Sequence, residues 1–104
     1  MVILETSLFT SQITALVNDD DYATFQIELI RDPAAGDLIR GGGGIRKIRM
    51  RLPGRGKSGG ARVVYFWLKD DATILMLLAY AKNVRANLSA RQVKTLNSLV
   101  KELQ

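Results

Sequence analysis

Basic residues are concentrated in one segment of the chain, where they could bind a polyanion. Between Arg40 and Arg62 there are eight basic residues and no acidic one, whereas the remainder of the chain has seven basic and ten acidic residues. The net charge of +5 therefore comes from 23 consecutive positions. This distribution is typical of a surface that binds nucleic acid. The basic residues of the segment are Arg40, Arg46, Lys47, Arg49, Arg51, Arg55, Lys57 and Arg62.

The composition limits the chemistry that these residues could perform. The chain has no cysteine and no histidine, which excludes disulfides, thiol nucleophiles, imidazole acids or bases and zinc sites of the Cys/His kind. Catalysis would depend on Lys, Arg, Tyr, Ser, Thr, Asp or Glu, and we expect no metal and no cofactor. Gly56-Lys57-Ser58 resembles the end of a P-loop, but Arg51 stands where the earlier glycine is required, so we reject a nucleotide site.

The length and hydrophobicity of the chain predict one folded unit. The 104 residues suffice for a single domain, residues 1–104, and 47% of them are hydrophobic, which favours a packed core. The N-terminus lacks the basic region of a signal peptide. The most apolar stretch, 72–81, is about half as long as a membrane-spanning helix. We therefore expect a cytoplasmic protein without a membrane partner.

Hydrophobic periodicity predicts strands and helices along the whole chain. A strand is expected over 2–5, a helix around 8–17, and a second helix that Asp19, Asp20 and Asp21 begin and cap and that ends before Pro33. Further strands are expected over 47–52, 62–68 and 73–80, with a tight turn at 70–71 between the last two. Ser89 is expected to cap a C-terminal helix.

The strand over 47–52 would display the basic residues in a row. Apolar residues alternate there with Lys47, Arg49 and Arg51, so the three cations should share one face of a sheet. A solvated face without a ligand is the simplest alternative, and Arg62 could instead pair with an acidic side chain. Tyr65 and Trp67 fit packing better than base stacking. The order β-α-α-β-β-β-α predicts an α+β fold, with an antiparallel sheet of about four strands and helices packed on it.

Several of these residues also occur in a pattern that resembles a known family. The run IRKIRMRLPGRGKSGGARVVYFWL, followed by an apolar strand that ends in AYAKN and by a short C-terminal helix, resembles the RelE/HigB superfamily of toxins from bacterial type II toxin–antitoxin systems, particularly its HigB-2-like branch. The resemblance implies a small RelE-like α+β domain with two N-terminal helices and a C-terminal helix. It also implies a toxin that occupies the ribosomal A site and cleaves messenger RNA without a metal, through attack of the ribose 2′-hydroxyl on the adjacent phosphate.

The resemblance assigns roles to particular residues. Arg62 matches a transition-state phosphate ligand, Lys47 and Arg49 match the two basic residues on the preceding strand, and Lys82 matches the lysine that closes the last strand. Asn83 matches the usual end of the branch motif, but an arginine and a C-terminal tyrosine of better-known relatives have no counterpart, so Tyr80 and Arg85 are local substitutes. The catalytic set is then Arg62, Lys47, Arg49, Lys82 and Tyr80, and the RNA-binding set is Arg46, Arg51, Arg55, Lys57, Asn83 and Arg85.

Two functions remain open at this point. The first is a ribosome-dependent mRNA endoribonuclease that inhibits translation and arrests growth. Its implied partners are a cognate helix-turn-helix antitoxin, the ribosome with its 16S ribosomal RNA and mRNA, and DNA only indirectly through the antitoxin complex. The second is a non-catalytic RNA- or DNA-binding module that uses the basic surface of residues 40–62.

Overall fold

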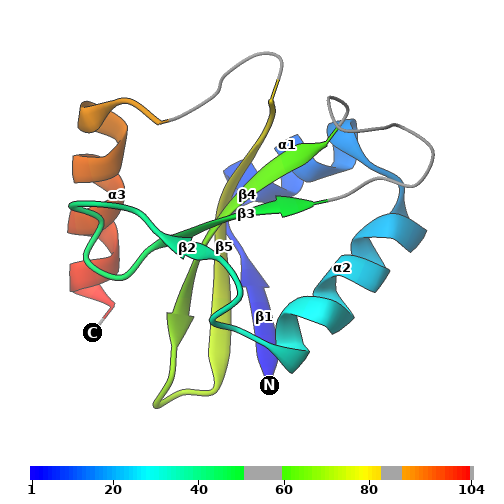
Figure 1. The fold of residues 1–104 in the computed structure, drawn as a ribbon, viewed down its shortest axis with the longest axis horizontal. Helices are drawn as coiled ribbons and strands as arrows, with labels where there is room; N and C mark the ends of the chain where they lie inside the picture. The colour runs from blue at the N-terminus through cyan, green and yellow to red at the C-terminus, as the bar shows by residue number, and fades with distance from the viewer. Residues whose placement is uncertain (51–59, 83–87, 104) are drawn as a thin grey trace.

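The computed structural model describes residues 1–50, 60–82 and 88–103. In these ranges the chain forms three helices and five strands (Figure 1). In chain order they are β1 (Val2–Glu5), α1 (Ser7–Leu16), α2 (Asp19–Arg31), β2 (Asp37–Leu38), β3 (Arg46–Met50), β4 (Ala61–Leu68), β5 (Thr73–Ala81) and α3 (Ala90–Glu102). No helix in the described part of the chain is both long and apolar enough to cross a membrane.

The strands form one mixed sheet in the order β1-β5-β4-β3-β2. The α+β class and the order of the predicted elements are confirmed, but the sheet has one strand more than expected and is not wholly antiparallel. The additional strand, β2, has only two residues, too few to produce a periodic pattern. Strand β1 pairs with β5 in parallel, Val2 opposite Thr73, although two helices and three strands separate the two in the chain.

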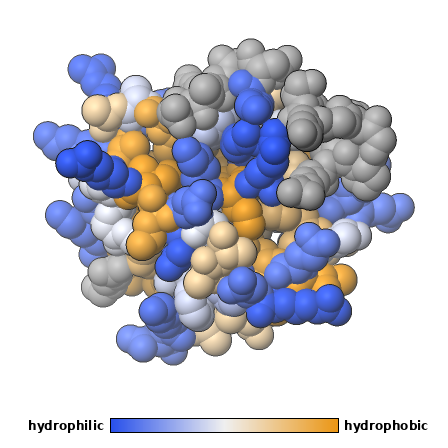
Figure 2. Space-filling view, in the orientation of Figure 1, coloured by the Kyte–Doolittle hydropathy of each residue, from blue (hydrophilic) through white to orange (hydrophobic). Residues whose placement is uncertain are grey.

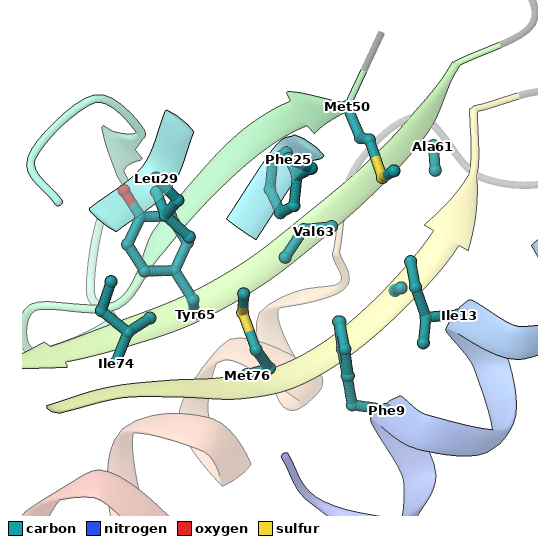
Figure 3. Packing of buried hydrophobic residues seen from close by; sticks show 11 residues of the cluster. Phe9, Ile13, Phe25, Leu29, Met50, Ala61, Val63, Tyr65, Ile74 and Met76 are labelled. Carbon is teal, nitrogen blue, oxygen red and sulfur yellow. The ribbon is translucent and has the colours of Figure 1, made fainter. Parts of the chain in front are cut away.

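One face of the sheet packs against α1 and α2. Phe9 and Ile13 of α1 and Phe25 and Leu29 of α2 are buried there. Figure 3 shows these side chains directed toward apolar residues of the central strands. The strand residues of this cluster are Met50, Ala61, Val63, Tyr65, Ile74, Met76 and Ala79. This cluster fixes the inward face of β3, β4 and β5, and strand alternation then sends the intervening residues to the opposite face.

The opposite face packs against α3. Leu96 and Val100 of the helix are buried against Ile45, Val64, Phe66 and Leu77. Figure 1 shows α3 on one side of the sheet and α1 and α2 on the other. The pairing of β4 with β5 shifts register between Val64 and Tyr65. The sheet is therefore covered on both sides, and α3 occupies the face on which the basic residues of β3 lie.

Helix termini follow the local sequence, with one correction. Asn18, not one of the three aspartates, caps α2: its side chain accepts a hydrogen bond of 2.8 Å from the Asp21 backbone N–H. The aspartates occupy the first turn, where negative charge is favoured by the helix dipole. At the C-terminal helix, Ser89 forms a capping box with Gln92, which confirms the predicted cap. The predicted turn between β4 and β5 is also confirmed, and it spans residues 69–72.

Candidate functional site

Three central strands bring two predicted cations and a tyrosine into one row. Arg49 on β3 lies opposite Arg62 on β4, and Arg62 lies opposite Tyr80 on β5. Residues that are opposite in adjacent strands share a face, with Cβ atoms about 4.5–5.5 Å apart. Val64 and Tyr80 belong to or pack against the cluster below α3, so this row and Lys47, opposite Val64, lie on the α3 side. All four are partly buried. We call Lys47, Arg49, Arg62 and Tyr80 the basic face.

The environment of Arg62 favours a bound anion. Its Nη1 atom is buried and has no hydrogen-bond partner among the described residues. Arg49, directly across the strand pair, has the same charge, and like charges at opposite positions destabilise a sheet. A buried donor without an acceptor costs about 1–3 kcal/mol. A phosphate oxygen would satisfy the donor and reduce the repulsion at the same time.

Polar and apolar side chains are interleaved around this face. In the orientation of Figure 1, the space-filling view shows dark-blue hydrophilic side chains directly beside orange apolar ones in the middle of the molecule (Figure 2). Beneath the surface, Val64 and Phe66 of the α3-side core lie on the same strand as Arg62. Low-dielectric surroundings strengthen electrostatic contacts with a ligand. The sheet therefore holds these cations where they can act strongly on an anion.

Sheet pairing adds an acidic residue that the sequence analysis missed. Asp37 on β2 lies opposite Lys47 on β3, so it stands at the edge of the basic face, although it precedes the acid-free segment in the sequence. The signal that could have found it is the register of β2, but a two-residue strand gives no periodicity. Asp37 is exposed, and its negative charge offsets the positive charge at the Lys47 end of the basic face.

Arg46 lies apart from the other predicted site residues. It is opposite Tyr65, which belongs to the core on the α1–α2 side. Its Nη1 atom donates hydrogen bonds to the backbone oxygens of Gly36, at 2.8 Å, and Ala34, at 3.2 Å. Arg46 therefore supports the connection between α2 and β2, and the structure does not bring it together with Arg62.

Tyr65 also stabilises the connection between α2 and β2, through two hydrogen bonds with its backbone. Its hydroxyl donates to the Pro33 backbone oxygen at 2.8 Å and accepts from the Gly36 N–H at 2.9 Å. Burial raises the pKa of Tyr65, and the hydrogen bond from Gly36 partly opposes that shift. The expectation that Tyr65 packs in the core is confirmed, since it is fully buried.

The remaining predicted residues lie at or beyond the ends of the described strands. Lys82 follows β5 directly, is exposed, and its backbone N–H donates to the Gly60 oxygen at 3.4 Å. It is thus next to the edge of the row formed by Arg62 and Tyr80. Outside the described residues lie Arg51, Arg55, Lys57, Asn83 and Arg85.

Four consecutive glycines at positions 41–44 form a loop, the four-glycine loop, that contacts α3. Asn97 of α3 donates from Nδ2 to the Gly41 backbone oxygen at 2.9 Å. A Cβ atom at Gly43 would lie 2.3 Å from Asn97 Oδ1, and Gly43 has a φ of +70°. The sequence analysis did not single out Asn97. The loop holds one flank of α3 in place, so glycine at position 43 is required by both backbone conformation and space.

Comparison with known proteins then identifies the family. The family model for the RelE toxin of the RelE/RelB toxin–antitoxin system matches residues 10–104. The chain belongs to the RelE toxin family. Solved structures agree at the level of the fold. The intact E. coli RelBE toxin–antitoxin complex contains a chain that is 15% identical, with a TM-score of 0.57 over 77% of this chain and 94% of that one. A mutant of E. coli toxin RelE in the free state is 16% identical, with a TM-score of 0.60 over 99% of this chain and 97% of that one.

Family membership confirms the resemblance seen in the sequence. This RelE-family chain has the predicted α+β architecture, and a toxin of a toxin–antitoxin system has an antitoxin as its partner. Its assignment to the HigB-2-like branch stays a prediction. Within the described ranges, no group of three or more acidic residues is arranged to hold a metal ion.

Proposed function

We propose that this RelE-family toxin is a ribosome-dependent mRNA endoribonuclease that inhibits translation and thereby arrests growth. The observation that carries the proposal is the buried Nη1 atom of Arg62, which has no partner among the described residues and lies opposite Arg49 and beside Tyr80. A protein that needed this arginine only for stability would supply it with an acceptor. A scissile phosphate supplies one.

The proposed reaction cleaves the RNA backbone by an internal displacement. The ribose 2′-oxygen forms a bond to the adjacent phosphorus while the bond from phosphorus to the 5′-oxygen of the next nucleotide breaks. The 2′-hydroxyl loses a proton and the departing 5′-oxygen gains one, which yields a cyclic phosphate and a free 5′-hydroxyl. Negative charge on the phosphate oxygens is stabilised by the guanidinium groups of Arg62 and Arg49, whose planar forks suit a phosphate.

Proton transfer would be performed by titratable side chains on or beside the basic face. Lys47 and Tyr80 share the face with Arg62, and Lys82 follows the end of β5. None of these is an imidazole, so we infer an enzyme whose rate depends mainly on positioning and charge stabilisation. The ribosome would orient the message, and the 16S ribosomal RNA of the A site would form part of the substrate's surroundings. Rapid cleavage of free RNA by the isolated chain would contradict this.

Regulation is proposed to follow the toxin–antitoxin pattern. A cognate antitoxin with a helix-turn-helix domain would neutralise the toxin in the cytoplasm. DNA would be contacted only indirectly, through that complex. Discovery of a small reading frame of this type directly beside the gene would support this part of the proposal, and its absence would count against it.

The decisive experiment compares Arg62→Ala with a matched arginine variant. Arg31, exposed at the end of α2 on the opposite side of the sheet, provides the control as Arg31→Ala. On ribosomes loaded with a defined message, Arg62→Ala should cleave about 10²–10³-fold more slowly, because one transition-state donor is lost. Arg31→Ala should cleave at the wild-type rate. Growth arrest on induction should follow the same order.

The competing function is a binding module without catalysis. It predicts that the wild-type chain binds RNA but leaves ribosome-bound messages intact and does not arrest growth. Circular dichroism of both variants distinguishes loss of cleavage from loss of fold. An intact message with folded wild-type protein would overturn the nuclease proposal.

A further inference from the structure

Strand β5 contains one residue more than β4 in the middle of their pairing. Val64 lies opposite Leu78, whereas the next residue, Tyr65, lies opposite Met76. Leu77 is therefore the extra residue between these two pairs. An extra residue of this kind forms a β-bulge, a feature that changes the direction of side chains and is frequent beside active sites.

The bulge changes the face of the sheet on which the later residues of β5 lie. Before the bulge, Ile74 and Met76 belong to the core below α1 and α2. After it, Ala79 belongs to that core, and Tyr80 packs against the core below α3. Side chains alternate between faces in a regular strand, so without the bulge Tyr80 would share the face of Met76. The bulge therefore places Tyr80 on the basic face, opposite Arg62.

The bulge lies at the point where β1 ends and α1 begins. Glu5, the last residue of β1, lies opposite Met76, and the Thr6 backbone N–H donates to the Met76 oxygen at 3.1 Å. The Thr6 side chain donates from Oγ1 to the Leu77 oxygen at 2.9 Å and accepts from the Phe9 N–H at 3.0 Å as the N-cap of α1. Thr6 thus joins the bulge to the start of this helix.

Gln12 of α1 bonds to β5 beyond the end of β1. Its Oε1 atom accepts a hydrogen bond of 2.8 Å from the Ala79 backbone N–H, a group that a neighbouring strand would otherwise bind. Gln12 is half-buried, and Figure 3 shows Phe9 and Ile13 of the same helix beside β5. Ala79 directly precedes Tyr80 in the chain. Gln12 therefore fixes the backbone next to a proposed proton-transfer group.

We propose that Gln12 is a positioning residue for RNA cleavage, which acts through Ala79 to direct the Tyr80 hydroxyl toward the phosphate bound by Arg62. A displacement of about 1 Å at a reacting group can slow a reaction about 100-fold. The effect on cleavage rests on the proposed function, whereas the effect on the direction of Tyr80 does not. A hydrogen bond that only stabilised the fold would have no specific effect on Tyr80.

The test compares two substitutions of Gln12 that differ in hydrogen bonding. Gln12→Met keeps the length of the side chain but removes the oxygen acceptor, whereas Gln12→Glu keeps an oxygen there. Thr14→Ala is the control, because this α1 hydroxyl donates to the Thr10 oxygen of its own helix. Gln12→Met should cleave ribosome-bound messages about 10–100-fold more slowly in single turnovers. Gln12→Glu and Thr14→Ala should cleave at nearly the wild-type rate.

Combination with Tyr80→Phe separates positioning from a general loss of stability. If Gln12 acts through the Tyr80 hydroxyl, Gln12→Met should slow the wild-type chain but cause no further loss in the Tyr80→Phe background. An equal loss in both backgrounds would overturn the proposal, and so would wild-type cleavage by Gln12→Met. The ribosome concentration that gives the half-maximal rate should stay unchanged, because the cations of the basic face are intact.

Nuclear magnetic resonance of the free chain tests the position of Tyr80 without cleavage. In Gln12→Met, the Ala79 amide should exchange its hydrogen faster, and the contacts of the Tyr80 ring with the core below α3 should weaken. Unchanged ring contacts would overturn the positioning proposal. These changes in a chain whose wild type cleaves no message would overturn only the proposed function. Gln12→Asn, which shortens the side chain by one methylene, repeats the test if Gln12→Met unfolds.

Discussion

Arg62 combines two unfavourable features that a ligand can remove together. Its buried Nη1 atom has no acceptor among the described residues, and its cross-strand neighbour Arg49 has the same charge. Both features become favourable once a phosphate occupies the face. The family resemblance predicted that Arg62 binds the phosphate. Lys47 and Arg49 were predicted as site residues both by that resemblance and by the alternation of residues 47–52. The burial of Nη1 could not be predicted, because it depends on which side chains the fold places around it.

Arg62→Lys tests whether geometry matters as well as charge. Lysine keeps the positive charge but lacks the planar fork that contacts two oxygens at once. We expect cleavage of ribosome-bound messages to slow about 10–100-fold, less than for Arg62→Ala. Single-turnover rates for both variants provide the measurement. Wild-type activity of the lysine variant would show that a point charge suffices.

Arg46 shows the limit of alternation at the residue scale. It belongs to the same basic run as Lys47, but strand pairing places it on the other face, where it donates to the Gly36 and Ala34 oxygens. The alternation of residues 47–52 correctly predicted that Lys47 and Arg49 share one face of the sheet. The strand begins at Arg46, one residue earlier than expected. The contact of Arg46 with RNA stays a prediction.

At the scale of elements, a carboxylate joins β1 to both N-terminal helices. Glu5 accepts hydrogen bonds of 2.6 Å from the Tyr22 hydroxyl on α2 and from Thr10 Oγ1 on α1. Burial raises the pKa of Tyr22 above its ordinary value of 10.0, and the hydrogen bond to Glu5 raises it further. The folded chain therefore binds the proton of the Tyr22 hydroxyl more strongly than the unfolded chain does.

The Tyr22 contact predicts a loss of stability at alkaline pH. Its contribution is fully present below pH 10, the unfolded pKa. As the pH rises further, the unfolded chain loses the proton first and binds fewer protons than the folded chain, so the free energy of unfolding falls. Tyr22→Phe should make this fall shallower. Thr24→Ala, which removes another α2 hydroxyl bonded only to backbone, should not. Urea unfolding from pH 8 to 11 tests this, and equal slopes for wild type and Tyr22→Phe would refute it.

The four-glycine loop provides a matched pair of substitutions. Gly41 and Gly43 both have positive φ, but a Cβ atom at Gly41 meets nothing within 4 Å, whereas one at Gly43 meets Asn97. Each alanine should cost about 1–2 kcal/mol of backbone strain. Gly43→Ala should cost about 0.5–1.5 kcal/mol more, since Asn97 must give up its hydrogen bond. Denaturant unfolding measures the difference, and equal losses would show that the loop does not hold α3.

Periodicity predicted most elements, and the exceptions have local causes. The end of α2 before Pro33 was predicted from the restriction that proline places on the preceding residue. The start of α3 after Ser89 was predicted from N-capping by serine. Strand β2 escaped prediction because it has two residues, and the Asn18 cap was hidden by the three aspartates that follow it. Parallel pairing of β1 with β5 could not be read from either strand, because each pattern is compatible with several partners.

Across the whole molecule, the basic face and α3 share one side of the sheet. The acid-free basic segment supplies Lys47, Arg49 and Arg62 there, and α3 packs on the same side through Leu96 and Val100. The count of charged residues predicted the concentration of positive charge, but only the strand order and register show that Arg49, Arg62 and Tyr80 form one row.

Salt should weaken RNA binding in proportion to the phosphates contacted. Three cations on single-stranded RNA give a slope of about −2 in a plot of log affinity against log salt. Affinity for a short RNA should therefore fall about 20-fold between 50 and 200 mM salt. Arg62→Ala should reduce the slope by about 0.7, and Arg31→Ala should leave it unchanged. Fluorescence anisotropy measures both. Binding that is insensitive to salt would exclude the basic face as the contact surface.

The pairing of β1 with β5 also determines how late in synthesis the sheet can be completed. The partner of Val2, Thr73, is added 71 positions after it, and Tyr80 joins Arg62 later still. At about 5–20 residues per second, the edge strand waits several seconds for its neighbour. A nascent chain stalled at residue 72 should leave β1 open to proteases. The sheet and its row of Arg49, Arg62 and Tyr80 are therefore completed only after Thr73 and Tyr80 have been added.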